Sequence, residues 1–259
     1  MKKMLIALFA LAIVPLQMTF AQTEEQQRII NMFDMVYVDG GSFSMGATPD
    51  QWTPDVHEDE MPVHFVTLSS YYIGMHEVTQ KQWVTVMGYN PSNWNGENMP
   101  VEQVSWDEVQ EFILRLNVMT GKNYRLPTEA EWEFAARGGN RTRGYKYSGS
   151  NSFDAIAWYR DNSGGKPHPV CTRGANELGI YDMCGNVLEW CSDRYEKNYY
   201  SYSPTKNPDG AAAGPYRVFR GTSWSNQLKS GRLSNRSYGE PTEKYNTLGF
   251  RLAMDAEEE

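Results

Sequence analysis

The sequence predicts a single domain, residues 35–254, that combines three helices with short strands. Three features predict it: three helix starts with one capping pattern, strand-like runs near both ends, and a middle section rich in Gly, Asn, Ser, Pro and Tyr that lacks periodicity. No linker or low-complexity tract divides the chain. At 40% hydrophobic residues in a length of 259, the chain can bury a sizeable core, which excludes a disordered or collagen-like protein.

The first 21 residues have the pattern of a secretory signal peptide. Two lysines precede an apolar run from Met4 to Val14 that is too short to span a bilayer, and small residues precede Gln22. We expect cleavage after Ala21 and a soluble exported protein that is periplasmic, cell-surface or secreted; an uncleaved anchor is the alternative. Residues 22–34 are a polar lead-in with one or two helical turns.

Composition and charge exclude two further classes of protein. Lys and Arg number 24 against 32 Asp and Glu, a net charge of −8, which argues against binding nucleic acid through its phosphates. No long apolar run follows the first twenty residues, so we expect no membrane-spanning segment. Residues 255–259 form an acidic tail that we expect to be solvated.

Three helices are predicted by a hydroxyl N-cap that is followed three residues later by Glu or Gln. Thr79 begins a helix that ends at Gly88, and Ser105 begins a longer one that ends at Gly121. Thr128 begins the third, which two glycines stop at 138–139.

Short strands are predicted before and after these helices. They are residues 35–38, 41–45, 65–68, 71–73, 217–220 and 249–253. The first two, joined by Asp39–Gly41, have the pattern of a hairpin. The long aperiodic stretch between the last helix and residue 217 is acceptable only if buried rings, disulfides or metal ions hold it in place.

Two groups of acids are interpreted as structural rather than chemical. Glu129, Glu131 and Glu133 lie at the start of the third predicted helix, where the helix dipole favours acids. The acidic stretch 55–60 is interpreted as a solvated face rather than a metal site formed with nearby histidines.

Three cysteines are an odd number for an oxidising compartment. We favour a local disulfide between Cys184 and Cys191, with Gly185 allowing the chain to turn and Cys171 left over. The alternative is that all three are buried thiols.

A series of motifs in a fixed order covers residues 36–253. They are Gly41-x-Phe43-x-Met45-Gly46, Pro100-Val101-x-x-Val104-Ser105-Trp106, Arg125-Leu126-Pro127-Thr128-Glu129-Ala130-Glu131-Trp132-Glu133, Gly185-Asn186-Val187-x-Glu189-Trp190, Arg220-Gly221-x-Ser223-Trp224 and Gly249-Phe250-Arg251. This series resembles the formylglycine-generating-enzyme family, also called the sulfatase-modifying-factor family. The resemblance implies a single α+β domain of C-type-lectin-like type with extensive ordered loop.

Active members of this family hold copper with two cysteines that follow the Arg-Gly-x-Ser-aromatic motif, and they oxidise a substrate cysteine to formylglycine. The corresponding positions here are Asn226 and about Gly231, and no cysteine follows Cys191. Thiolates suit Cu(I), whereas an amide and a glycine cannot form that site. We therefore expect no copper and no oxidase activity of this type.

The turn at residues 184–189 offers a carboxylate, an amide oxygen and backbone carbonyls, the oxygen ligands that Ca²⁺ prefers. The resemblance implies calcium bound by the side chains of Asn186 and Glu189 and by the carbonyls of Gly185 and Val187. The alternative is that both side chains only hydrogen-bond the turn. A second calcium of the family would fall near residues 162–164.

The predicted function is an exported, non-catalytic binding module, or a module of envelope or secretion assembly, whose ligand is a protein or a glycan. The region from residue 223 to 238 would be its recognition surface, since polar loop residues suit adaptable contacts. The surface residues are Ser223, Trp224, Asn226, Gln227, Arg232 and Arg236. The alternatives are a formylglycine-generating-type oxidase or other oxidoreductase acting on protein cysteine, and a lectin-like variable ligand-binding protein.

Overall fold

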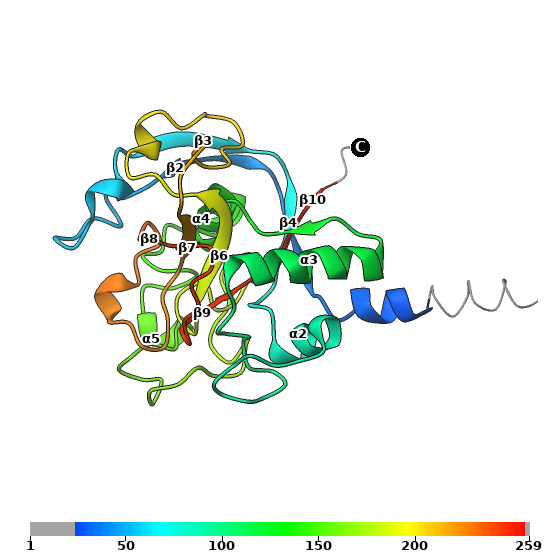
Figure 1. Ribbon diagram of the computed structural model, residues 1–259. Helices are drawn as coiled ribbons and strands as arrows, with labels where there is room; N and C mark the ends of the chain where they lie inside the picture. The colour runs from blue at the N-terminus through cyan, green and yellow to red at the C-terminus, as the bar shows by residue number, and fades with distance from the viewer. Residues whose placement is uncertain (1–23, 257–259) are drawn as a thin grey trace, which may run out of the picture.

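The computed structural model describes residues 24–256, which form two four-stranded sheets, a two-stranded sheet and several helices (Figure 1). The first sheet joins the two ends of the described chain and is antiparallel throughout. Its order is β1 (Met35–Val38), β4 (Tyr71–Gly74), β10 (Ala253–Asp255) and β5 (Tyr124–Arg125). The mixture of helices and short strands confirms the predicted α+β class.

The second four-stranded sheet lies at the centre of the molecule in Figure 1. Its order is β8 (Arg236–Gly239), β7 (Arg217–Arg220), β6 (Leu188–Arg194) and β9 (Leu248–Phe250). Only the pairing of β6 with β9 is parallel among these strands. Neither β6 nor β8 was predicted, because neither segment alternates apolar and polar residues clearly.

The predicted hairpin near the N-terminus is wrong. β1 pairs with β4, whereas β2 (Gly41–Met45) pairs with β3 (His64–Leu68) in the separate two-stranded sheet. The intervening residues cross from one sheet to the other. A Cβ atom at Gly40 would lie 2.7 Å from the carbonyl oxygen of Leu68, so this crossing requires glycine.

The three predicted helices are confirmed, and each begins with the predicted capping box. They are α2 (Gln80–Met87), α3 (Trp106–Thr120) and α4 (Glu129–Ala136). Gly88 and Gly121 end the first two in the left-handed conformation. The shorter elements are α5 (Phe153–Ile156), η1 (Glu58–Glu60), η2 (Gly139–Arg141), η3 (Tyr199–Ser201) and η4 (Leu228–Ser230).

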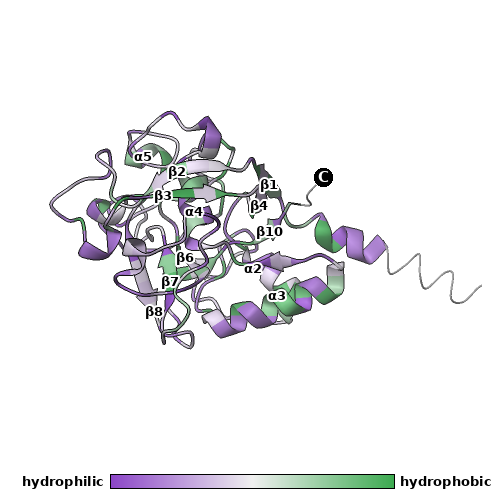
Figure 2. Cartoon of the chain, turned by 90° about the horizontal axis from the view of Figure 1, so that it is seen from above, coloured by the Kyte–Doolittle hydropathy of each residue, from purple (hydrophilic) through white to green (hydrophobic). Residues whose placement is uncertain are grey.

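One of two apolar cores lies beneath α2 and α3. The ring of Trp83 stacks on Phe112 at 5.2 Å between centroids, and Phe250 of β9 meets Phe112 edge-on at 5.3 Å. Figure 2 shows α3 with alternating green and purple segments, as expected of a helix with one face on this core. Residues 24–30 are helical and bury Ile29 in the same core, so the lead-in packs on the domain.

Asp255, the first residue of the predicted acidic tail, belongs to β10, and its carboxylate pairs with Arg125 at 2.6 Å; residues 257–259 of that tail lie outside the described residues. The predicted signal peptide lies outside the described residues. Across residues 24–256, the longest helices are too short or too polar to cross a membrane.

α4 is buried on every side, and all eight of its residues are buried, the three glutamates included. Buried carboxylates require partners, because an unpaired charge in the interior costs several kcal/mol. The helix dipole alone therefore does not account for these acids, which must have buried partners.

Candidate functional site

Four segments distant in sequence converge on one end of the molecule, which we call the loop face: residues 90–98, 158–173, 223–230 and Asn246. The backbone N–H of Val170 donates to the carbonyl of Asn98 at 2.9 Å, and that of Arg160 donates to Asn226 at 3.0 Å. The loops that follow α2 and α5 accordingly lie beside each other at the lower edge of Figure 1. The aperiodic middle section is thus pinned by hydrogen bonds and rings.

Trp94 is held on this face by its own backbone. Its N–H donates to the carboxylate of Glu102 at 3.2 Å, and its carbonyl accepts from the side chain of Gln80 at 2.6 Å. Glu102 is buried, which raises the pKa of its carboxyl to about 7 although the backbone N–H groups of Asn93 and Trp94 oppose the shift.

Trp224 packs edge-on against Trp94, with ring centroids 5.0 Å apart and an interplanar angle of 73°. Its indole N–H donates to the carbonyl of Asn246 at 3.0 Å. Its carbonyl accepts from the hydroxyl of Ser163 at 2.8 Å, and its backbone N–H donates to the carbonyl of Asn186. Both tryptophans are half-buried and have fixed backbones.

The two positions that the resemblance predicts as counterparts of the copper cysteines, Asn226 and about Gly231, have structural roles here. The carboxamide oxygen of Asn226 turns inward and accepts from the hydroxyl of Ser223 at 2.7 Å and from its backbone N–H at 2.9 Å. Gly231 faces Phe153, whose ring atoms would lie 2.4 Å from a Cβ at this position. A dithiolate copper site does not fit this arrangement.

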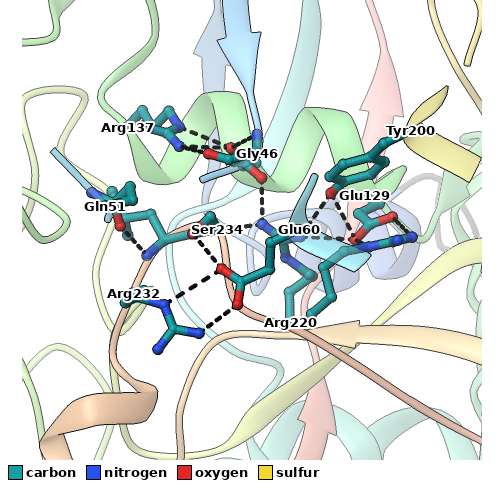
Figure 3. Close-up of polar contacts among 12 residues, drawn as sticks. Gly46, Gln51, Glu60, Glu129, Arg137, Tyr200, Arg220, Arg232 and Ser234 are labelled. Atoms are coloured by element: carbon teal, nitrogen blue, oxygen red, sulfur yellow. Dashed lines mark hydrogen bonds and ion pairs between the residues drawn. The ribbon is translucent and has the colours of Figure 1, made fainter. Parts of the chain in front are cut away.

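α4 forms ion pairs with β7 and β8, and Figure 3 shows the pair between Glu129 and Arg220. Glu129 accepts from Arg236 at 2.7 and 2.8 Å and from Arg220 at 2.8 Å. Glu133 pairs with Arg220 and, at 2.8 Å, with Arg137. Burial would raise the pKa of Glu129, but the two guanidinium groups hold it below its ordinary value.

A second buried pair joins the acidic stretch to the segment that precedes β8. Glu60 pairs with Arg232 and accepts from the hydroxyl of Ser234 at 2.6 Å (Figure 3). Burial favours the neutral acid, but the hydrogen bonds, that of Arg232 foremost, lower the pKa of Glu60. The interpretation of residues 55–60 as a wholly solvated face is therefore wrong at Glu60 and Asp59, which are buried.

The predicted recognition surface is correspondingly smaller than expected. Arg232 and Arg236 are buried in ion pairs with glutamates, and Ser223 is buried beneath the loop. Trp224 and Asn226 are half-buried and Gln227 is exposed, so these three reach the surface. Polar composition misled the prediction because the acidic partners of both arginines are distant in sequence.

The predicted calcium ligands have other partners. Both carboxylate oxygens of Glu189 accept from Arg251 at 2.6 Å, and one also accepts from the indole of Trp132 at 2.7 Å. The amide oxygen of Asn186 accepts from the backbone N–H of His168 at 2.9 Å. Gly185 and Val187 flank Asn186, but without the Glu189 carboxylate the predicted ligand set does not fit calcium.

Nor do the residues near the second implied calcium converge on a cation. The carboxamide oxygen of Asn162 accepts from the backbone N–H of Tyr159 at 2.9 Å, and Gly164 is an exposed glycine with φ of 65°. Within the described chain no cluster of three His, Cys, Asp or Glu side chains could hold a metal ion.

The predicted disulfide does not form. Cys184 and Cys191 are buried thiols, and Cys171 is a half-buried thiol. The sulfur of Cys184 lies 3.9 Å from the carbonyl of Gly231, whereas that of Cys191 lies 3.9 Å from the carbonyl of Glu189. Burial raises the pKa of Cys184 to about 12, which makes it a poor nucleophile.

Residues 19–256 match the family described as "Sulfatase-modifying factor enzyme 1-like domain". The chain therefore belongs to the sulfatase-modifying-factor family, as its motifs indicated.

Two curated relatives and one solved structure illustrate the range of the family. The chain is 35% identical over 251 residues to the "Chaperone protein LppX" of Paenibacillus barcinonensis, covering 78% of this chain and 82% of that protein. It is 37% identical over 177 residues to the formylglycine-generating enzyme of Streptomyces coelicolor, covering 62% and 54%. The structure of Treponema denticola variable protein 1 superimposes with a TM-score of 0.78 and 32% identity, covering 86% and 95%.

Proposed function

We propose that this chain is an exported, non-catalytic binding module of the family and that the loop face recognises its ligand. The observation that carries the proposal concerns the two positions predicted as counterparts of the family's copper cysteines. Asn226 caps Ser223 from within the loop, and the ring of Phe153 occupies the space that a side chain at position 231 would need. The scaffold around the family's oxidase site is kept while the thiolates that would hold Cu(I) are replaced.

Two of the similarities are compatible with a non-catalytic role, whereas the Streptomyces coelicolor relative is named for the oxidation. A relative that the chain covers over 82% of its length is named a chaperone, and the structural neighbour at TM-score 0.78 is named a variable protein. We infer for this chain either an assembly role toward an envelope or secreted protein, or capture of a ligand on its loops. The order of Lys2, Lys3, the apolar run and Ala21 supports export.

The oxidase alternative is tested directly. The purified chain, loaded with Cu(I), is incubated in air with a cysteine-containing sulfatase-type peptide, and the peptide mass is followed. We expect the cysteine to persist, because residues 226 and 231 supply no thiolate. The Streptomyces coelicolor formylglycine-generating enzyme serves as the positive control. Conversion of the peptide by this chain would overturn the proposal.

Export is tested separately by the N-terminus of the mature protein. Mass spectrometry of the protein recovered from the cell envelope or medium should find Gln22 as the first residue. Retention of the first 21 residues, or recovery only from the cytoplasm, would contradict the proposed export. Neither result would contradict the proposed binding role.

A further inference from the structure

Trp94 and Trp224 form a pair of aromatic rings, which we call the platform. The backbone N–H and carbonyl groups of both residues already form hydrogen bonds within the protein. Trp94 is fixed through both its N–H and its carbonyl, and Trp224 through its N–H, its carbonyl and its indole. Aromatic side chains held in this way lose little conformational entropy when a ligand binds. Both rings remain half-buried rather than covered.

By contrast, several polar side-chain groups on the same segments form no hydrogen bond within residues 24–256. The indole N–H of Trp94 and the carboxamides of Asn93, Gln227 and Asn246 have no hydrogen-bond partner among residues 24–256. The side-chain NH₂ of Asn226 is likewise unpaired in this part of the chain, since only its oxygen is engaged. A carboxamide both donates and accepts, so the free carboxamides on the segments that carry or contact the two tryptophans suit a ligand rich in hydroxyls.

Two of the cations in or beside the loop face are neutralised by neighbours, whereas Lys166 has no acidic partner among residues 24–256. Lys81 pairs with Glu97 at 3.2 Å, and Arg160 pairs with Asp161 at 3.2 Å. Recognition of phosphate or carboxylate uses arginine or lysine groups that are free to form charge-assisted bonds. Trp94, Trp224 and the carboxamides of their own segments are uncharged, so contacts made by these groups themselves favour a neutral ligand.

We propose that the Trp94–Trp224 platform binds a neutral oligosaccharide. The apolar face of a sugar ring would pack on the indole of Trp94, and its hydroxyls would bond to the carboxamides of Asn93, Gln227 and Asn246. The inference rests on the proposed binding function and names its ligand class. It requires no metal ion.

The test is a titration of the full chain with cellotetraose, maltotetraose, mannotetraose and N-acetylglucosamine tetramer, followed by calorimetry and tryptophan fluorescence. Trigalacturonate is the acidic counterpart. We expect saturable binding of at least one neutral tetramer, with trigalacturonate bound more weakly. Trp94→Ala should weaken that binding by about tenfold or more, as truncation of a central aromatic contact does.

Two variants control for folding and specificity. Trp94→Phe keeps an aromatic ring in the same loop and should retain part of the affinity. Trp52→Ala removes another exposed tryptophan, on the segment between β2 and η1, and should leave binding unchanged. Thermal melting confirms that each variant is folded.

The proposal is overturned if no neutral tetramer saturates at millimolar concentration, or if Trp94→Ala binds as well as the unmodified chain. A protein partner that binds the same face in the absence of glycan binding would overturn this inference but uphold the proposed function. Conversion of a peptide cysteine to formylglycine would instead defeat the proposed function, whatever the glycan result.

Discussion

The guanidinium of Arg236 forms a bidentate ion pair with the carboxylate of Glu129, at 2.7 Å from Nε and 2.8 Å from Nη2. The two residues are 107 positions apart in the chain, and both side chains are buried. Arg220 contacts the same carboxylate from β7. The pair therefore connects α4 to the sheet that carries the loop face.

Arg236→Ala should lower the free energy of unfolding by about 3–5 kcal/mol, because it leaves the Glu129 charge buried with one guanidinium fewer. Urea denaturation measures the change. Arg115→Ala is the matched control, since Arg115 forms an exposed pair with Glu111 on α3 and should cost less than about 0.5 kcal/mol. Equal effects of the two substitutions would show that the buried network does not stabilise the fold.

Gly231→Ala should destabilise the chain by about 1–3 kcal/mol through overpacking against Phe153. Gly231 has an ordinary φ of −78°, so the backbone itself tolerates alanine. Phe153→Leu in the same background should recover part of the loss, as a thermal-melting comparison of the double and single variants would show. If the losses of stability from the two substitutions simply add in the double variant, the ring of Phe153 is not what destabilises Gly231→Ala.

Asp193→Asn should flatten the dependence of stability on pH. Burial, with a smaller contribution from Glu129, raises the pKa of Asp193 to about 8, so the folded chain holds a proton that the unfolded chain releases near pH 4. This stabilising contribution is complete below the unfolded pKa and is lost as pH rises toward 8, with a slope of at most about 1.4 kcal/mol per pH unit.

The measurement is denaturant unfolding of Asp193→Asn and the unmodified chain between pH 4 and pH 9. Asparagine can still accept the N–H of Glu129 that now bonds Asp193 at 2.8 Å. Asp209→Asn, an exposed aspartate, should leave the slope unchanged. Parallel curves for Asp193→Asn and the unmodified chain would contradict the raised pKa.

Glu189→Gln should cost stability to the same extent in calcium buffer and in chelator, because the carboxylate pairs with Arg251 and bonds Trp132. Leaving the guanidinium of Arg251 buried without its counter-charge should cost about 3–5 kcal/mol. Melting curves with and without chelator provide the comparison. A chelator effect in the unmodified chain that the variant loses would restore Glu189 as a calcium ligand.

Local features of the sequence were sufficient for the helices but not for the site. The capping boxes at Thr79, Ser105 and Thr128 involve residues three positions apart, so they could be recognised without knowledge of the fold. The burial of Glu129 depends on Arg220 and Arg236, which are 91 and 107 positions away. A single sequence contains no signal for such pairs.

The same limit explains the calcium and disulfide predictions. The oxygen-rich turn around Asn186 has the composition of a cation site, but Arg251, 62 positions after Glu189, satisfies the carboxylate. Proximity in sequence suggested that Cys184 and Cys191 would bond, although their sulfurs contact different carbonyls. For the loop face, the sequence identified Trp224, Asn226 and Gln227 but missed Trp94, which joins them only through tertiary packing.

The ion pairs between α4 and β7 and β8 also set an order of folding. Until residue 236 has been synthesised, Glu129 has no bidentate partner. Burial of α4 before that point would leave the Glu129 carboxylate in the interior without this counter-charge. The first sheet likewise lacks its central strand β10 until residue 253. A nascent chain therefore cannot complete its fold from its N-terminal part before residues 236 and 253 have been synthesised.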